Sequence, residues 1–164
     1  MTISRTPFDP HLLEGDGWLP DARRVPSPNE DARPPDTVID LLVIHNISLP
    51  PGDFGGPWIE QLFQNRLDPE ATPHFAPIAG HQFVDLRRRA WHAGASCFQG
   101  RAACNDFSIG IELEGTDDRP FTNAQYERLG LVTRQIMSRH PRITPARITG
   151  HSDIAPGRKT DPGP

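Results

Sequence analysis

The order of apolar and polar residues predicts two strands that matter for function. Residues 38–44 are an apolar, largely β-branched run typical of a buried strand, and His45 stands at its end. In open α/β sheets, ligands bind at such strand ends. Residues 108–114 alternate, so successive side chains point to opposite faces of a sheet. One face carries Ile109, Ile111 and Leu113, and the other carries Gly110, Glu112 and Glu114.

Two segments have apolar residues at helical spacing. Pro57 fits the first position of a short helix that extends through Asn65. Its apolar stripe consists of Trp58, Ile59, Leu62 and Phe63. Thr122 and Gln125 have the spacing of a capping box, which predicts the start of the longest helix, and Pro141 ends it. The core face of this helix is predicted to hold Tyr126, Leu129, Val132, Ile136 and Met137.

The length of 164 residues predicts one domain, residues 1–164, with a single core. Prolines interrupt residues 1–37, which are therefore predicted to form an extended N-terminal arm. The arm is expected to be pinned to the core by Trp18, Leu19 and Val25, while residues 1–9 fray. Nineteen prolines and fourteen glycines predict long ordered loops. His74 and His81 lie in a stretch without a clear pattern, and we expect surface or supporting roles for them.

The formal net charge of −4 gives no general attraction to nucleic acid or to an anionic membrane. Residues 1–7 lack the apolar segment of a secretory signal, and no apolar run is long enough to span a bilayer. We therefore expect a cytoplasmic monomer without nucleic-acid or membrane partners. Cys97 and Cys104 are too few for a disulfide framework and are expected to be reduced.

The candidate chemistry is concentrated in residues 150–164, a segment too rich in proline and glycine to predict helix or strand. His151 and Asp161 offer an imidazole and a carboxylate, which zinc accepts, and His45 is the best candidate for a third ligand. Lys159 is the only lysine among seventeen basic residues and stands two positions before Asp161. Its compact ammonium suits a developing oxyanion, and the alternative is a chance surface lysine.

Glu112 and Glu114 lie on one strand face roughly 7 Å apart, so one can face a metal site while the other lies nearer its rim. The alternative is a solvated strand face. Gly110 disfavours that alternative, because a glycine inside a strand often marks the close approach of a ligand or another backbone. Trp91 and His92 stand between small residues, where they can form a substrate-binding wall or simply pack.

Four segments together resemble the AmpD-type 1,6-anhydro-N-acetylmuramoyl-L-alanine amidases. In chain order they are LVIHNISLPPG at 42–52, RAWHAG at 89–94, CNDFSIGIELEGTD at 104–117 and TGHSDIAPGRKTDPG at 149–163. The resemblance covers most of the chain from Gly17 onward. It implies a single zinc amidase domain with the type 2 amidase fold, an α/β (α+β) architecture with a central mixed β-sheet, flanking helices and long loops.

The resemblance also implies roles for individual residues. The zinc ligands would be His45, His151 and Asp161. The catalytic residues would be Glu112 and Lys159, although spacing alone does not choose Glu112 over Glu114. The substrate-binding residues would be Asn46, Trp91 and His92, the last with a supporting role as an alternative.

The implied reaction is hydrolysis of the amide between 1,6-anhydro-N-acetylmuramic acid and L-alanine during cell-wall recycling, with an anhydromuropeptide as substrate and Zn²⁺ as cofactor. The sequence departs from the family pattern between Gly80 and His81, where relatives carry an additional hairpin of roughly 15 to 20 residues. Its loss would trim the sheet beside the peptide-binding end and leave the zinc motifs intact.

Two other functions are weighed against this reading. One is a non-catalytic muropeptide sensor of the same fold, which the complete set of ligand and catalytic candidates disfavours. The other is a lytic amidase that acts on intact peptidoglycan, which the specific resemblance to recycling enzymes disfavours.

Overall fold

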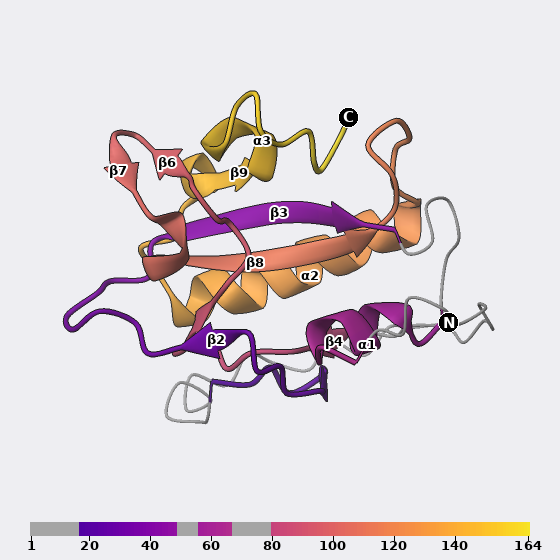
Figure 1. The fold of residues 1–164 in the computed structure, drawn as a ribbon, viewed down its shortest axis with the longest axis horizontal. Helices are drawn as coiled ribbons and strands as arrows, with labels where there is room; N and C mark the ends of the chain where they lie inside the picture. The colour runs from indigo at the N-terminus through magenta and orange to yellow at the C-terminus, as the bar shows by residue number, and fades with distance from the viewer. Residues whose placement is uncertain (1–16, 49–55, 67–79) are drawn as a thin grey trace.

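The computed structural model describes residues 17–48, 56–66 and 80–164. Within them, the central sheet consists of β8 (Ser108–Glu114), β3 (Leu41–Ile47) and β9 (Ile148–Gly150), in that order (Figure 1). Both pairings are parallel. Parallel strands end at the same edge of a sheet, so the carboxyl ends of these three strands lie close together.

The apolar run of β3 is buried on both faces, as predicted for a central strand. Leu42 and Ile44 belong to one buried cluster, and Leu41 and Val43 belong to another on the opposite face. This double burial explains why the run has no polar position between Leu41 and Ile44.

The predicted limits of this strand are wrong at both ends. Val38 is 52% exposed and precedes the strand, which begins at Leu41. Pairing with β8 continues as far as Ile47 opposite Glu114. His45 therefore lies inside the strand rather than after it, because the tertiary pairing extends the strand beyond its apolar run.

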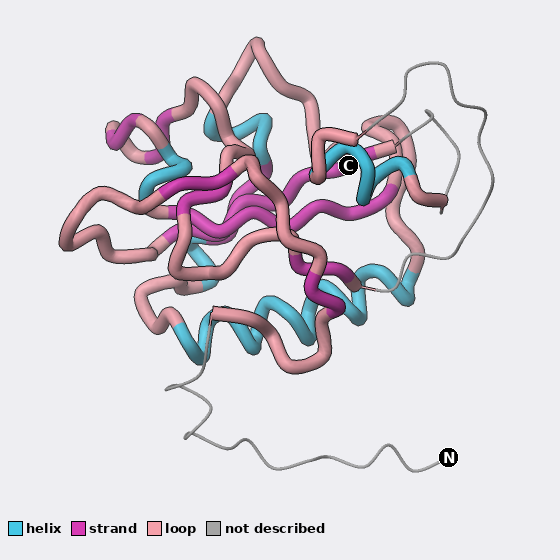
Figure 2. Tube along the Cα trace, turned by 60° about the horizontal axis from the view of Figure 1, so that its bottom comes forward, coloured by secondary structure: helices cyan, strands magenta, loops and turns pink. Residues whose placement is uncertain are grey.

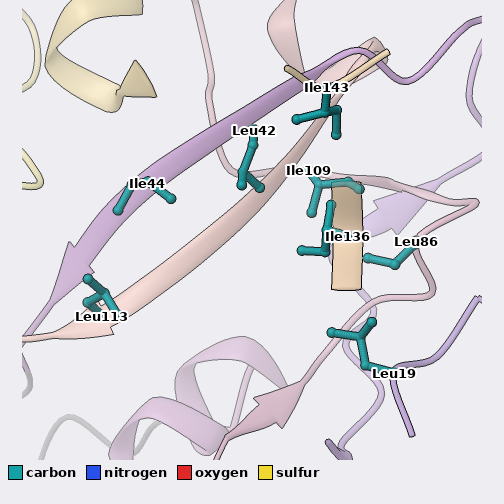
Figure 3. Close-up of a cluster of buried hydrophobic side chains, with 8 residues drawn as sticks. All are labelled: Leu19, Leu42, Ile44, Leu86, Ile109, Leu113, Ile136 and Ile143. Atoms are coloured by element: carbon teal, nitrogen blue, oxygen red, sulfur yellow. The ribbon is translucent and has the colours of Figure 1, made fainter. Parts of the chain in front are cut away.

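Helix α2 (Asn123–Arg139) covers the face of the sheet that carries Leu42 and Ile44 (Figure 3). The predicted capping box is confirmed, since Gln125 N donates to Thr122 Oγ1 and Thr122 N donates to Gln125 Oε1. The cluster in Figure 3 contains Leu19, Leu42, Ile44, Leu86, Ile109, Leu113, Ile136 and Ile143. The apolar face of β8 that the alternating pattern predicted is thus confirmed as part of the core.

One predicted core residue of α2 is not in the core. Tyr126 is 44% exposed and packs edge-on against Phe121 near the start of the helix. Ile136, farther along the helix, is 1% exposed and occupies the centre of the cluster. The helical period identified the face, but only the packing decides where along the helix that face is covered.

The short helix α1 (Trp58–Phe63) follows Pro57 and buries Trp58 and Ile59. It ends before the predicted Asn65, whose φ of 56° lies in the left-handed region and breaks the helical path. Leu62, predicted to be in the core, is 37% exposed. Phe63 stacks on Phe83 with ring centroids 4.4 Å apart.

The N-terminal arm is held to the molecule by short pairings. β1 (Arg23–Arg24) pairs parallel to β4 (His81–Gln82), and β2 (Glu30–Asp31) pairs antiparallel to β5 (Arg89–Ala90). Leu19 and Val25 are buried as predicted, and Trp18 is partly buried. His81 contacts the short helix α1, since its Nε2 lies 3.0 Å from Glu60 Oε1.

The expectation that residues 150–164 contain neither helix nor strand is wrong at their start. Gly150 ends β9, and His151–Ile154 form one helical turn, α3. The prolines of the segment follow this turn at positions 156, 162 and 164, so they do not interrupt it. Asp153 Oδ2 also accepts from Gly150 N at 3.0 Å, which stabilises the first turn.

The remaining elements are β6 (Cys97–Phe98), β7 (Arg101–Ala102), η2 (Cys104–Asp106) and η3 (Pro145–Arg147). Loops form much of the chain, and helices lie on both sides of the central strands (Figure 2). The predicted α/β fold with flanking helices and long loops is confirmed. Antiparallel pairing occurs in the small ladders β2–β5 and β6–β7, whereas the three central strands are parallel.

Cys97 and Cys104 are free thiols. Within the described ranges, no helix combines the length and the apolarity that a bilayer crossing needs. The predictions about residues 1–9, residues 68–79 and His74 fall outside the described residues.

Candidate metal centre

Three side chains from separate segments meet at the edge where β3 and β9 end. His45 belongs to β3, His151 begins α3, and Asp161 lies in the C-terminal turn. His45 Nδ1 is 3.0 Å from His151 Nδ1, and Asp161 Oδ2 is 3.1 Å from each nitrogen. Both imidazoles are 2% exposed. The structure therefore brings together the three residues that the sequence singled out as ligands.

The contacts of His151 show which of its nitrogens is free for a metal. Nε2 lies 3.1 Å from the carbonyl oxygen of Ala93, which can only accept a hydrogen bond. Nε2 therefore carries the proton of the neutral ring, and Nδ1 presents its lone pair to His45 and Asp161.

The spacing of the three atoms fits a metal ion. A triangle with sides near 3 Å is what three ligands form when each lies about 2 Å from one zinc ion. Two imidazoles and one carboxylate are also a ligand set that zinc accepts, and three protein ligands leave a position for water. His45, His151 and Asp161 thus fit zinc in both donor chemistry and spacing.

The loop that carries Asp161 is held by hydrogen bonds of the C-terminal segment. Ser152 N donates to the carbonyl oxygen of Asp161 at 2.8 Å, which joins the turn to α3. Thr160 Oγ1 donates to the carboxylate of Asp117, in the loop after β8. These contacts fix the position of Asp161 relative to the sheet.

Asn46, predicted to bind substrate, lines the cleft around these ligands. Its amide is used inside the molecule, because Nδ2 donates to Asp117 Oδ1 at 2.6 Å and to the carbonyl oxygen of Pro162 at 3.0 Å. Asp117 was not among the site residues expected from the sequence, although it ends the motif at 104–117. The structure shows that Asn46 and Asp117 together anchor the tail that carries Asp161.

Glu112 faces the same cleft. It is the register partner of His45 in the adjacent parallel strand, so both side chains leave the same face of the sheet. Burial raises the pKa of Glu112 to about 8, with the Asp161 carboxylate acting in the same direction and the Lys159 ammonium in the opposite one. Glu114 is paired with Ile47 farther along the strand and does not line the cleft, which distinguishes the two carboxylates that spacing left open.

The cleft has a volume of about 480 Å³. Lys159 is exposed at its wall, close enough for its charge to act on both Glu112 and His45. Burial lowers the pKa of His45 to about 4, the neighbouring His151 adds to this effect, and Asp161 opposes it. A neutral imidazole is the form that binds a metal.

Trp91 and His92 have different environments although they are adjacent in the chain. Trp91 is 56% exposed, and it is not one of the described residues that line the cleft. His92 lines the cleft and turns its ring inward, with Nδ1 2.8 Å from His45 Nε2. Burial lowers the pKa of His92 well below its usual value. The glycine at position 110 was expected to mark the close approach of another group, and His92 is that group. A β-carbon on Gly110 would lie 2.7 Å from His92 Nδ1.

Two residues that the sequence did not reveal hold this segment. Asn105 Oδ1 accepts from the backbone N–H groups of His92 and Ala93 at 3.2 and 2.7 Å. Arg158 Nη2 donates to the carbonyl oxygens of Ala93 and Ala95 at 2.7 and 2.8 Å. Asn105 thereby orients the carbonyl group to which His151 donates.

A larger cavity of about 660 Å³ adjoins the cleft at Glu112 and His92. Its walls are mainly apolar and include β8, α1 and α2. In the part of the chain that the structure describes, β8 is an edge strand of the sheet on this side.

The known proteins to which this chain is similar are amidases. A family model described as N-acetylmuramoyl-L-alanine amidase matches residues 35–164. The 1,6-anhydro-N-acetylmuramyl-L-alanine amidase AmpD of Enterobacter cloacae is 59% identical over an alignment 168 positions long, which covers 93% of this chain and 89% of that protein. The crystal structure of a selenomethionine AmpD derivative matches with a TM-score of 0.83 and 53% identity over 92% of each chain.

A more distant match holds a ligand. It is the complex of the Escherichia coli N-acetylmuramyl-L-alanine amidase AmiD with its substrate anhydro-N-acetylmuramic acid-L-Ala-D-γ-Glu-L-Lys. The TM-score is 0.52 at 28% identity, with 80% of this chain and 56% of that chain covered.

Proposed function

This chain belongs to the N-acetylmuramoyl-L-alanine amidase family, and we propose that it hydrolyses the amide between 1,6-anhydro-N-acetylmuramic acid and the L-alanine of muropeptides in a zinc-dependent reaction. The observation that carries the proposal is the triangle of His45 Nδ1, His151 Nδ1 and Asp161 Oδ2, with sides of 3.0 to 3.1 Å. Glu112 and Lys159 line the cleft above it.

The ligands of the proposed zinc ion are His45, His151 and Asp161. When bound, zinc supplies a Lewis acid that polarises the scissile carbonyl and lowers the pKa of a water molecule toward neutrality. Burial lowers the pKa of His45 and so favours its neutral imidazole, the form that binds the ion.

Glu112 is the proposed general base and then general acid. The charge of Lys159 favours the ionised form of Glu112, and this carboxylate takes a proton from the attacking water and passes it to the amine nitrogen of the departing alanine. Its position on β8, in register with His45, supports this role because it places the carboxylate on the same face as the ligands.

Lys159 is the proposed cation for the oxygen of the scissile carbonyl. Negative charge grows on that oxygen as water adds, and a nearby ammonium stabilises it most strongly in the transition state. Lys159 is exposed at the wall of the cleft, where a substrate can reach it.

The substrate assignment rests on similarity. The AmpD of Enterobacter cloacae is named for the anhydromuramyl-L-alanine amide, and the E. coli AmiD complex contains an anhydromuramyl tripeptide. We further propose that the chain acts as a cytoplasmic monomer on recycled fragments. We assign no direct substrate contact to Asn46 or His92, since the amide of Asn46 and the ring of His92 bind other parts of the chain. Trp91 is exposed and lines the larger cavity beside the cleft, and it keeps its proposed role in substrate binding.

The test is a purified chain, assayed for zinc content and for release of the L-alanine-terminated peptide. Anhydromuropeptide and intact sacculi are compared as substrates at equal concentrations of muramyl-peptide bonds. We expect one zinc per chain and release from anhydromuropeptide in large excess over sacculi.

The alternative outcomes are separable. Binding of anhydromuropeptide without hydrolysis, in zinc-loaded protein, would indicate a sensor and overturn the proposal. Preferred release from sacculi would indicate a lytic amidase, and hydrolysis that survives complete removal of metal would refute the zinc mechanism.

A further inference from the structure

A row of hydrogen bonds leads from a backbone carbonyl group to the candidate metal centre. Ser108 Oγ lies 2.6 Å from the carbonyl oxygen of Cys104 and 3.0 Å from His92 Nε2. His92 Nδ1 lies 2.8 Å from His45 Nε2. The other nitrogen of His45 belongs to the triangle with His151 and Asp161.

The direction of each hydrogen bond follows from the first one. A carbonyl oxygen only accepts, so the single hydrogen of the Ser108 hydroxyl points to Cys104. Ser108 Oγ must then accept at its other contact, and the donor there is the Nε2–H of His92. One proton of His92 is thereby fixed on the nitrogen that faces away from His45.

The second nitrogen of His92 is left as an acceptor. A proton on it as well would place a full charge on a ring that is packed inward against Gly110 and whose two nitrogens contact Ser108 and His45. Burying a charge without a counterion is costly. A neutral His92 accepts from His45 Nε2–H, so the proton of His45 lies on Nε2 and the lone pair of Nδ1 points at Asp161 and His151.

We propose that His92 is a positioning residue that fixes the tautomer and the ring orientation of His45 through the relay Cys104 carbonyl, Ser108, His92. The inference rests on the proposed metal site, but its proton arrangement exists without the ion. His45 and His151 are then held in the same way, since each donates its Nε2–H to the protein and keeps Nδ1 for the metal. His151 donates to the Ala93 carbonyl oxygen, and His45 donates to His92. Outer partners of this kind typically contribute 10- to 100-fold in metal affinity.

Gly110 is part of the same arrangement. A β-carbon at this position would come within 2.7 Å of His92 Nδ1 and 2.8 Å of its Cγ, so the ring must shift if any side chain is added. Gly110→Ala therefore disturbs the relay without removing any of its polar groups.

The first experiment uses metal-free wild-type chain and long-range ¹H–¹⁵N spectra of its histidine rings. We expect His92 to be protonated at Nε2 and bare at Nδ1, and His45 to be protonated at Nε2. A proton on His92 Nδ1 would overturn the proposal, whether or not the protein hydrolyses any substrate. Failure of the proposed function would instead leave this tautomer pattern intact.

The second experiment compares zinc affinity of two nearly isosteric variants by competition with a chromophoric chelator. His92→Asn keeps an acceptor near the position of Nδ1, whereas His92→Leu removes it. We expect His92→Leu to weaken zinc binding by about 10- to 100-fold and His92→Asn to restore most of the loss. Ser108→Ala and Gly110→Ala should fall between these limits.

The matched control is the same pair of changes at His81, which contacts Glu60 outside the metal cleft and should leave zinc affinity unchanged. Equal weakening in His92→Asn and His92→Leu would reduce His92 to a packing role, and unchanged affinity in both would refute the relay. If a variant does not fold, the ring spectra of the wild-type chain still decide the proposal.

Discussion

Glu112 of β8 stands in register opposite His45 of β3, and the two strands run parallel. Paired residues of neighbouring strands project from the same face of a sheet. The strand pairing therefore places a carboxylate beside the candidate ligand, and it places Glu114 one repeat farther along, opposite Ile47. The two glutamates should therefore differ in their contribution to catalysis.

Glu112→Gln should lower kcat by at least about 100-fold, because the amide cannot take the proton of the attacking water. Zinc content and folding should stay as in the wild type. Glu114→Gln is the control from the same strand face and should keep most of the activity. Steady-state kinetics with anhydromuropeptide check both variants, and the reverse order of the two effects would move the catalytic role to Glu114.

Lys159→Met should fold and retain zinc, and its kcat should fall much more than its affinity for substrate. The methionine keeps a long apolar stem but lacks the charge that would stabilise the transition state. Lys159→Arg should restore activity only in part, since a planar guanidinium places its charge differently. The measurements are single-turnover rates and substrate Kd. Weaker binding at unchanged kcat would show that Lys159 only holds the substrate.

Metal removal should lower stability as well as activity. At a free zinc concentration about 1,000 times its Kd, binding to the folded state adds about 4 kcal/mol to the free energy of unfolding. This increment should disappear in the presence of a chelator, and it should be strongly reduced in Asp161→Ala at the same zinc concentration. Urea unfolding with and without zinc measures it. Asp118→Asn changes a 75% exposed carboxylate and is the control, which should keep the full increment.

His140 should make stability depend on pH below neutrality. Burial lowers the pKa of His140, with the cationic side chains of Arg33 and Arg139 acting in the same direction. The folded state therefore favours the neutral ring, and the unfolded state binds a proton first, near pH 6.5. The contribution of His140 is fully present above that pH and is lost as the pH falls toward its folded-state pKa.

His140→Gln should remove this part of the pH dependence. The free energy of unfolding of the variant should fall less steeply than that of the wild type between about pH 7 and pH 5. Denaturant unfolding across this range, at one fixed zinc concentration, gives the comparison. Parallel curves for the two proteins would show that His140 titrates normally in the folded state.

Local patterns in the sequence determined the elements and their faces. The alternation of residues 108–114 requires Ile109 and Leu113 to share a face, and the structure buries both in one cluster. The capping box at Thr122 depends on residues three positions apart, and it forms as predicted. Such features can be derived from sequence because the interacting groups are neighbours in the chain.

The limits of elements were less predictable where tertiary contacts set them. β3 extends past its apolar run because β8 pairs with it as far as Ile47, and Leu62 of α1 is exposed although it fits the helical stripe. Neither outcome is encoded in the period of the apolar residues. Both depend on which part of each element another segment covers.

The candidate metal centre shows the same difference between what the sequence predicts and what tertiary contacts decide. Residue types and motifs identified His45, His151 and Asp161, since zinc chemistry restricts the possible ligands. Only the folded chain decides that Asp161 lies 3.1 Å from His45 across 116 positions of sequence, that Trp91 lines the larger cavity rather than the metal cleft, and that Asn46 secures the tail. The relay from Cys104 through Ser108 and His92 was also invisible in the sequence, because a hydrogen-bond direction depends on which atoms meet and not on which residues are present.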